Sequence, residues 1–163
     1  MESILRIKQK MATATFAAGC FWHVEEAFRK KKGVLKTTSG YSGGMKENPS
    51  YEQVSTSTTG HAESVQVEYD EKQLPYDELL KTFWSVHDPT QLNRQGPDVG
   101  NQYRSIIFYH TPAQKAAALK SREQEQKKHK KPIATEILPA GKFYPAEEYH
   151  QKYLMKRGRN VCY

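Results

Sequence analysis

The chain has 163 residues, of which 37% are hydrophobic, 11% aromatic and 26% charged, and its formal net charge is +7 at pH 7. This length and balance predict one folded domain and exclude a disordered chain. No run of about 18 apolar residues occurs, so no membrane span is expected. Two cysteines are too few for the disulfide framework of a small secreted domain.

The spacing of apolar residues predicts a chain that alternates between strands and helices. The expected strands cover residues 12–18, 34–40, 61–69, 105–110 and 133–138, and the expected helices cover residues 21–28, 76–87, 112–130 and 145–156. Strand 61–69 is the clearest, because Val65, Val67 and Tyr69 alternate with polar residues. Glycine and proline mark two long loops, after residue 40 and over residues 87–100, and loops of that length are usually functional.

The order of these elements predicts the fold class. The first six read β-α-β-β-α-β, which is the ferredoxin-like pattern, and an α-β-α extension follows. We therefore expect an α+β two-layer sandwich with a mixed or antiparallel sheet. Residues 1–163 are expected to form a single catalytic domain, with a poorly ordered start over residues 1–10 and a mobile C-terminal tail over residues 157–163.

Basic residues gather in two places, residues 29–32 and 120–131. The second run, KSREQEQKKHKK, mixes in glutamates and glutamines and contains no aromatic residue. This mixture favours a solvated helix surface over a nucleic-acid-binding patch. A basic RNA-binding domain is the alternative from the class of binding modules, and it would depend on residues 127–131 and on salt concentration.

The N-terminal residues resemble a lipoprotein signal in outline, since Arg6, Lys8 and Lys10 precede FAAGC with Cys20 at its end. The intervening stretch 11–18 contains threonines and few large apolar side chains, whereas a signal has a strongly apolar segment there. We therefore expect a cytoplasmic protein with no membrane partner.

Cys20 is the first candidate for chemistry. It follows a strand and Gly19 at the expected start of a helix, where backbone N–H groups favour the thiolate. The alternative is a small buried residue, because cysteines without a disulfide are often buried. Phe21 fits the apolar face of the helix and could be part of the core, whereas Trp22 lies off that face and could line a small apolar pocket.

Glu63 shares a strand face with Val65 and Val67. A carboxyl group on an apolar face is desolvated, which favours its protonated form and makes it a candidate general acid. The alternative is a frayed strand end at which Glu63 reaches water. Tyr41 and Tyr51 are expected in the first long loop, and Tyr103 lies just past the second.

A phenol can donate a hydrogen bond to a developing negative oxygen, although loop tyrosines are common. Cys162 lies in the tail, 142 positions after Cys20. It could resolve an oxidised sulfur at Cys20 or be an inert thiol. Two distant cysteines and six scattered histidines show no zinc-ligand spacing, so we expect no metal and no cofactor.

A set of motifs in fixed order resembles one enzyme family, the class A peptide methionine sulfoxide reductases. The motifs are GCFWHVEEAF (19–28), GYSGG (40–44), NPSYEQV (48–54), TGHAESV (59–65), HDPTQ (87–91), RQGPDVGNQYRS (94–105) and EYHQKY (148–153). The resemblance covers about residues 12–153, and an ordered set of motifs is more specific than GCFW alone.

The resemblance implies a role for each matched residue. Cys20 would be the nucleophile, Phe21 and Trp22 the walls of a methyl pocket, and Asp98 a supporting hydrogen-bond partner. By the same resemblance, Tyr51, Glu63 and Tyr103 would surround the sulfoxide oxygen, and Cys162 would resolve a Cys20 sulfenic acid to a disulfide. The family reduces the S epimer of methionine sulfoxide, free or in proteins, and repairs oxidised proteins with thioredoxin as reductant.

Two departures from the family pattern affect these expectations. His23 stands where the family often has a small residue, and the chain stops one residue after Cys162. We therefore expect one resolving thiol, no relay and a monomeric enzyme. A peroxide-reducing thiol protein is the alternative enzyme class, because it would share Cys20 and a resolving thiol without needing Trp22.

Overall fold

The computed structural model describes residues 10–158. Its long strands are β1 (Met11–Ala18), β2 (Val34–Ser42), β3 (Ala62–Asp70) and β6 (Ser105–Tyr109), and its short ones are β4 (Arg94–Gln95), β5 (Asp98–Val99), β7 (Glu136–Pro139) and β8 (Phe143–Pro145). The helices are α1 (Phe21–Arg29), α2 (Tyr51–Ser55), α3 (Tyr76–Ser85), α4 (Pro112–Gln126) and α5 (Tyr153–Lys156), with short 3-10 helices at Asn101–Tyr103 and Glu148–His150.

Six strands form one mixed sheet in the order β7-β6-β1-β3-β2-β8. Its central strands β6-β1-β3-β2 are antiparallel and carry the split β-α-β order expected from the sequence. β7 adds to one edge in parallel and β8 to the other edge antiparallel. The α+β class and the mixed sheet are therefore as predicted, and β4 and β5 form a separate small hairpin.

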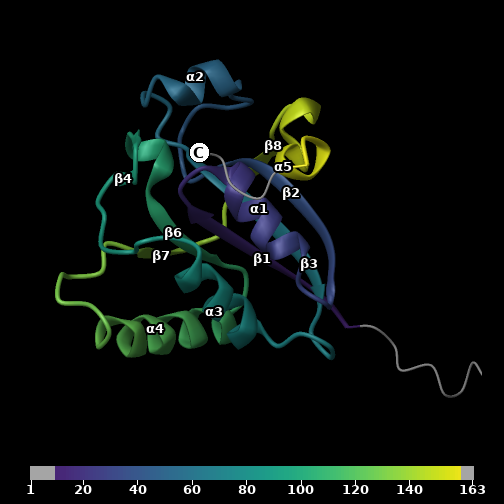
Figure 1. Ribbon diagram of the computed structural model, residues 1–163, viewed down its shortest axis with the longest axis vertical. Helices are drawn as coiled ribbons and strands as arrows, with labels where there is room; N and C mark the ends of the chain where they lie inside the picture. Colours follow the sequence, from purple (N-terminus) through teal and green to yellow (C-terminus); the bar gives the residue numbers. More distant parts are fainter. Residues whose placement is uncertain (1–9, 159–163) are drawn as a thin grey trace, which may run out of the picture.

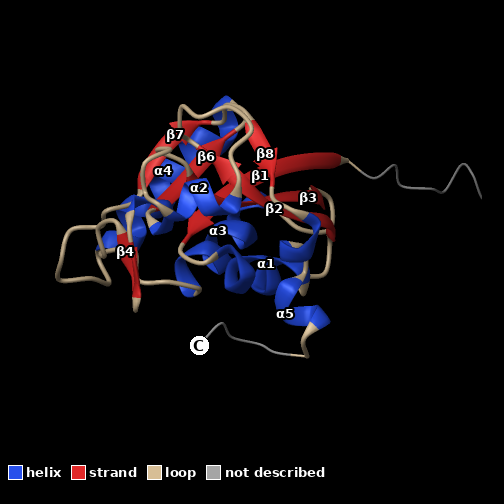
Figure 2. Ribbon diagram, turned by 90° about the horizontal axis from the view of Figure 1, so that it is seen from above, coloured by secondary structure: helices blue, strands red, loops and turns tan. Residues whose placement is uncertain are grey.

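Helices α1 and α3 cover the same face of the sheet (Figures 1 and 2). Side chains of β3 point to this face at every second position, and Val65, Val67 and Tyr69 are fully buried there. Phe21, Val24 and Phe28 of α1 join them with Leu79, Leu80 and Phe83 of α3 in one core cluster. This packing makes α1 a rigid support for the residues at its start.

Several sequence-based boundaries prove wrong for physical reasons. The expected helix over 145–156 is instead the end of β8, a 3-10 turn and the one-turn helix α5, because Pro145 and its neighbours pair with β2. The strand expected over 133–138 is β7, which lies at Glu136–Pro139, and it is followed by β8 rather than being the last strand. Tyr41 lies in β2, not in a loop, because β2 continues to Ser42.

The expectations for residues 1–9 and for residues 159–163, Cys162 included, lie outside the described part of the chain. Lys10 and Gly158 bound the described region; the Lys10 backbone N–H donates to Oδ1 of Asp70, and the Lys10 carbonyl accepts the Glu71 backbone N–H. Between these bounds, none of the helices has the length and apolarity that crossing a bilayer requires.

Candidate active site

Three strand ends meet at one end of the sheet and bring distant residues together. β1 and β3 are antiparallel with Phe16 opposite Val65, so the same register carried on by two residues places Glu63 beside the end of β1. Ala18, the last residue of β1, also faces Ser105 at the start of β6. Cys20, Glu63 and Tyr103 therefore come from three segments that converge, as the family resemblance requires.

Cys20 is the N-cap of α1 and is only partly buried, so the alternative of a wholly buried structural thiol does not hold. Gly19 before it has φ of +96°, which glycine adopts without strain. A Cβ at this glycine would lie 2.9 Å from Gln95 of the β4–β5 hairpin. The turn therefore places the hairpin against the start of α1 and aims the helix N-terminus at the site.

Glu63 is 2% exposed, so its strand end is not frayed to water. Its Oε1 accepts a hydrogen bond of 3.2 Å from the backbone N–H of Phe21. The Glu63 carboxyl is thus held by the backbone of the residue that follows Cys20, and it is shielded from water. This is the environment expected for a proton donor.

Tyr51 and Tyr103 carry perturbed hydroxyl groups. Burial, the Glu63 carboxyl and Cys20 raise the pKa of Tyr51 to about 12. Burial, followed by Glu63 and Tyr51, also raises the pKa of Tyr103. Burial raises the pKa of Asp98, which adds to the field on Tyr103. Both phenols are protonated at neutral pH, as any tyrosine is, and can donate hydrogen bonds; the raised pKa values show that their ionisation is further disfavoured at this site.

Aromatic rings form the wall beside these polar groups. The Phe21 ring stacks on Tyr51 with centroids 6.3 Å apart, and the Trp22 ring stacks on Tyr51 at 6.5 Å. The Trp22 indole N–H donates to Nδ1 of His150 over 2.9 Å, and the Tyr153 ring stacks on Trp22 at 3.8 Å. Trp22 is thus partly buried, packs against the edge of the core cluster and lies beside Tyr51.

Sequence reasoning missed His150, Tyr153 and Glu147 as parts of this site. Glu147 accepts the Tyr41 hydroxyl at 2.9 Å and the Tyr51 backbone N–H at 3.0 Å. Burial opposes its ionisation, but these hydrogen bonds outweigh burial and hold the pKa of Glu147 low. The available signal was EYHQKY, whose position among the family motifs suggested importance without suggesting a contact.

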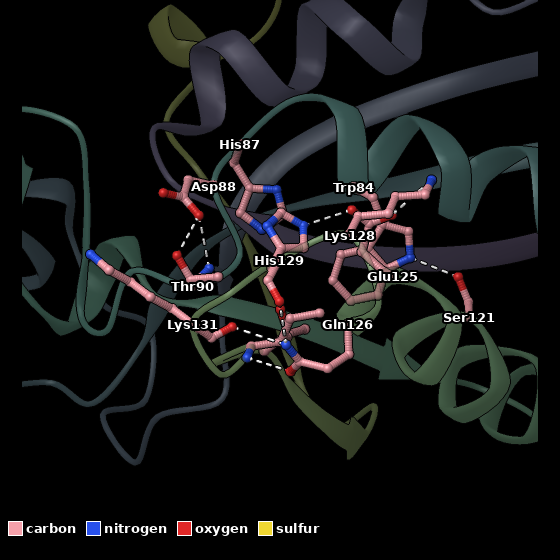
Figure 3. Close-up of polar contacts among 12 residues, drawn as sticks. Trp84, His87, Asp88, Thr90, Ser121, Glu125, Gln126, Lys128, His129 and Lys131 are labelled. Atoms are coloured by element: carbon pink, nitrogen blue, oxygen red, sulfur yellow. Dashed lines mark hydrogen bonds and ion pairs between the residues drawn. The ribbon is translucent and has the colours of Figure 1, made fainter.

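The loop that carries Asp98 is anchored by His87 at the end of α3. One ring nitrogen of His87 pairs with the Phe83 carbonyl at 2.8 Å, and the other pairs with the Ser105 hydroxyl at 2.7 Å. Burial lowers the pKa of His87 to about 4, so the ring is neutral. At the base of the loop, the Asp88 carboxyl accepts two hydrogen bonds from Thr90, one from its backbone N–H and one from its hydroxyl (Figure 3).

The basic run after α4 has local partners. His129 pairs with Glu125 at 2.8 Å, Lys128 forms an ion pair with the same carboxyl at 3.5 Å, and Gln126 donates to the Lys131 carbonyl at 2.9 Å (Figure 3). These contacts lie within one helix and its final turn, on the α3–α4 side of the molecule. They fit the solvated surface that the composition favoured.

Cys162, the expected resolving thiol, falls outside the described residues. Within residues 10–158, no group of three or more histidine, cysteine or acidic side chains is arranged to hold a metal ion.

Comparisons with known proteins agree on one family. The family model of peptide methionine sulfoxide reductase matches residues 12–163. The peptide methionine sulfoxide reductase MsrA of Geobacter sulfurreducens is 60% identical over 151 residues, covering 91% of this chain and 93% of that protein.

Solved structures show the same likeness. Mxr1 from Saccharomyces cerevisiae in reduced form has a TM-score of 0.88 at 39% identity, with 94% of this chain and 89% of that chain covered. Mxr1 in complex with Trx2 has a TM-score of 0.64 at 31% identity, with 90% of this chain and 89% of that chain covered.

Proposed function

This chain belongs to the peptide methionine sulfoxide reductase family, and we propose that Cys20 is the nucleophile with which it reduces methionine sulfoxide to methionine. The protein is an oxidoreductase, and its relatives carry the MsrA name. The observation that carries the assignment of Cys20 is its place at the N-cap of α1, one residue before the N–H that Glu63 accepts.

The chemistry follows from the chain's own groups. A sulfoxide oxygen leaves poorly until it is protonated, and the desolvated carboxyl of Glu63 supplies the proton while Tyr51 and Tyr103 hold the oxygen. The Cys20 thiolate, favoured by the helix N-terminus, attacks sulfur. Oxygen passes to Cys20, so methionine leaves as the thioether and Cys20 becomes a sulfenic acid.

The sulfoxide sulfur is pyramidal, and the site fixes the directions of its methyl group, its oxygen and the attacking thiolate. The methyl group packs against Phe21 and Trp22, the oxygen faces the acid and phenols, and the thiolate approaches sulfur. Together with burial, the negative charge of Asp98 helps to raise the pKa of Tyr103 and so favours the phenol that donates to the oxygen. Such an arrangement accepts one epimer, and the resemblance to the class A reductases supports the S epimer as that one.

Resolution and reduction complete the cycle. The Cys162 thiol attacks the sulfenic acid, water leaves, and a Cys20–Cys162 disulfide forms. Thioredoxin then reduces this disulfide, an assignment supported by the solved complex of the yeast relative with Trx2. The substrate is methionine sulfoxide free or in damaged proteins, and we assign the enzyme to the cytoplasm as a monomer that uses no cofactor.

Thiol counting in single turnovers tests this proposal. Without reductant, one equivalent of the S epimer is expected to consume two thiols and yield a Cys20–Cys162 disulfide by peptide mapping. Cys162→Ser is expected to turn over once and lose one thiol, because it stops at the sulfenic acid. The R epimer and hydrogen peroxide are the comparison substrates. Equal turnover of both epimers, or faster turnover of peroxide, would overturn the assignment.

A further inference from the structure

Glu25 is a buried carboxyl group for which the mechanism above has no use. It lies on α1 three residues after Trp22, so both side chains leave the helix on neighbouring parts of one face. Glu25 is 1% exposed. Burying a carboxylate is costly unless hydrogen bonds replace its water.

The hydrogen bonds of Glu25 join three parts of the chain. Oε2 accepts the Thr37 hydroxyl at 2.8 Å, and Oε1 accepts the Ser39 hydroxyl at 3.0 Å, both from β2. Oε1 also accepts the backbone N–H of Lys152 at 2.7 Å. Lys152 belongs to the C-terminal segment, defined here as residues 146–157, which lies beside α1 and β2 (Figure 1).

The Lys152 backbone needs support at this point. Its φ of +52° and ψ of +39° are left-handed, a conformation that is unfavourable for a residue with a Cβ. The N–H bond to Glu25 holds this turn from the helix side. Gln151 holds it from the strand side, since its amide exchanges two hydrogen bonds, of 2.8 and 2.9 Å, with the Ser39 backbone.

The two residues that hold Trp22 flank this turn. His150 precedes it and accepts the Trp22 indole N–H, and Tyr153 follows it and stacks on the Trp22 ring with an interplanar angle of 9°. The Arg157 guanidinium lies over the other side of this stack, 4.2 Å from the Tyr153 centroid. The edge and one face of Trp22 are therefore positioned by residues on either side of Lys152.

We propose that Glu25 is a positioning residue for sulfoxide reduction: by accepting the Lys152 N–H, it sets the turn that holds Trp22 as the wall of the methyl site. The proposal rests on the proposed function for the identity of the substrate. Glu25 does not touch the reacting atoms, and its effect on the reaction passes through residues 150–153 to Trp22.

The choice of variants separates position from charge. In Glu25→Leu the donors on Thr37, Ser39 and Lys152 lose their acceptor. In Glu25→Gln the amide oxygen still accepts from Lys152, and the amide NH₂ can donate to the Thr37 hydroxyl oxygen. Glu26→Leu is the matched control, because Glu26 is also buried on α1 but forms ion pairs with Arg29 and with Lys30 at the end of the same helix.

The decisive measurement is the ratio of kcat/KM for a methyl sulfoxide to that for the matching ethyl sulfoxide. An inactive or unfolded fraction cancels from this ratio, so simple destabilisation does not move it. We expect Glu25→Leu to lower the ratio about fivefold or more, chiefly through a higher KM for the methyl substrate. Glu25→Gln and Glu26→Leu are expected to stay within about twofold of the parent protein, since neither removes the Lys152 acceptor.

Fluorescence provides a readout that needs no substrate. With Trp84→Phe as background, Trp22 is the remaining tryptophan of the two in the chain. Glu25→Leu is expected to shift its emission to longer wavelength and to increase acrylamide quenching. If Glu25→Leu does not fold, Gln151→Ala loosens the same turn from the strand side and is expected to shift both readouts in the same direction by less.

An unchanged methyl-to-ethyl ratio together with unchanged Trp22 emission in the folded variants would overturn the positioning role. The same holds if Glu26→Leu moves both readouts as far as Glu25→Leu does. Failure of the parent protein to reduce any sulfoxide would instead sink the proposed function, and the fluorescence comparison would still decide the link between Glu25 and Trp22.

Discussion

Two helical regions lie on the same face of the sheet, α3 with α4 and the start of α1, and they differ in how their charged and aromatic side chains are paired. Around α3 and α4, Trp84 donates to Ser121 and packs edge-on against Phe83, and ion pairs such as Lys81–Glu78 stay within one helix. Around the start of α1, buried carboxyl groups collect hydrogen bonds from segments far apart in sequence. On the α3–α4 side the ion pairs are local, whereas at the start of α1 the hydrogen bonds join segments that are far apart in the sequence around Cys20.

The largest loss of activity is expected from a substitution at Cys20, at the start of α1. Cys20→Ser should lower sulfoxide reduction by about 10³-fold or more, because an alcohol is a far weaker nucleophile than a thiolate at neutral pH. Its urea unfolding curve should match that of the parent protein, since Cys20 is the cap residue and serine is a good cap. Turnover close to the parent rate would place the nucleophile elsewhere.

Glu63→Gln comes next. The glutamine oxygen can still accept the Phe21 N–H, so the fold is expected to remain, while the amide cannot supply a proton. The single-turnover rate of sulfenic acid formation should fall about 10²–10⁴-fold, the range for loss of a general acid. Stopped-flow measurement of methionine release checks this. An unaltered rate would show that the proton comes from another group.

His87 joins α3 to the loop that carries Asp98, and its burial makes the stability of the fold depend on pH. Burial lowers its pKa to about 4 from 6.5, so below pH 6.5 the unfolded chain takes up a proton that the folded chain does not. Stability should therefore fall between pH 6.5 and 4, by up to about 3 kcal/mol from this group.

Urea unfolding of the parent protein and of His87→Gln at pH 7 and pH 4.5 measures this contribution. The parent protein should lose more stability between the two pH values than the variant does. Equal losses would mean that His87 is not the titrating group and that other buried groups cause the acid sensitivity.

The smallest effect is expected on the α4 side. Replacing Lys127, Lys130 and Lys131 together by glutamine should leave kcat/KM within about twofold, because exposed charges far from a site contribute little. The same variant tests the RNA-binding alternative by filter binding at low and high salt. Salt-sensitive RNA binding that the three changes abolish would revive that alternative.

Local patterns predicted the parts of the molecule that local physics controls. Alternation in β3 identified both the strand and the inward face of Glu63, and the residues after Gly19 identified the start of α1. The C-terminal region was misassigned because its conformation depends on pairing with β2 and on Glu25. The Trp22–His150 bond links residues 128 positions apart, and no periodicity in either segment encodes it.

The backbone at Gly19 limits how this enzyme can vary. An alanine there would need a left-handed backbone and would collide with Gln95, so the β4–β5 hairpin would have to retreat. That hairpin contains Asp98, which is far from Cys20 in the sequence. A single methyl group at position 19 would therefore displace both the turn before Cys20 and the hairpin that carries Asp98, and random mutagenesis should recover position 19 almost exclusively as glycine.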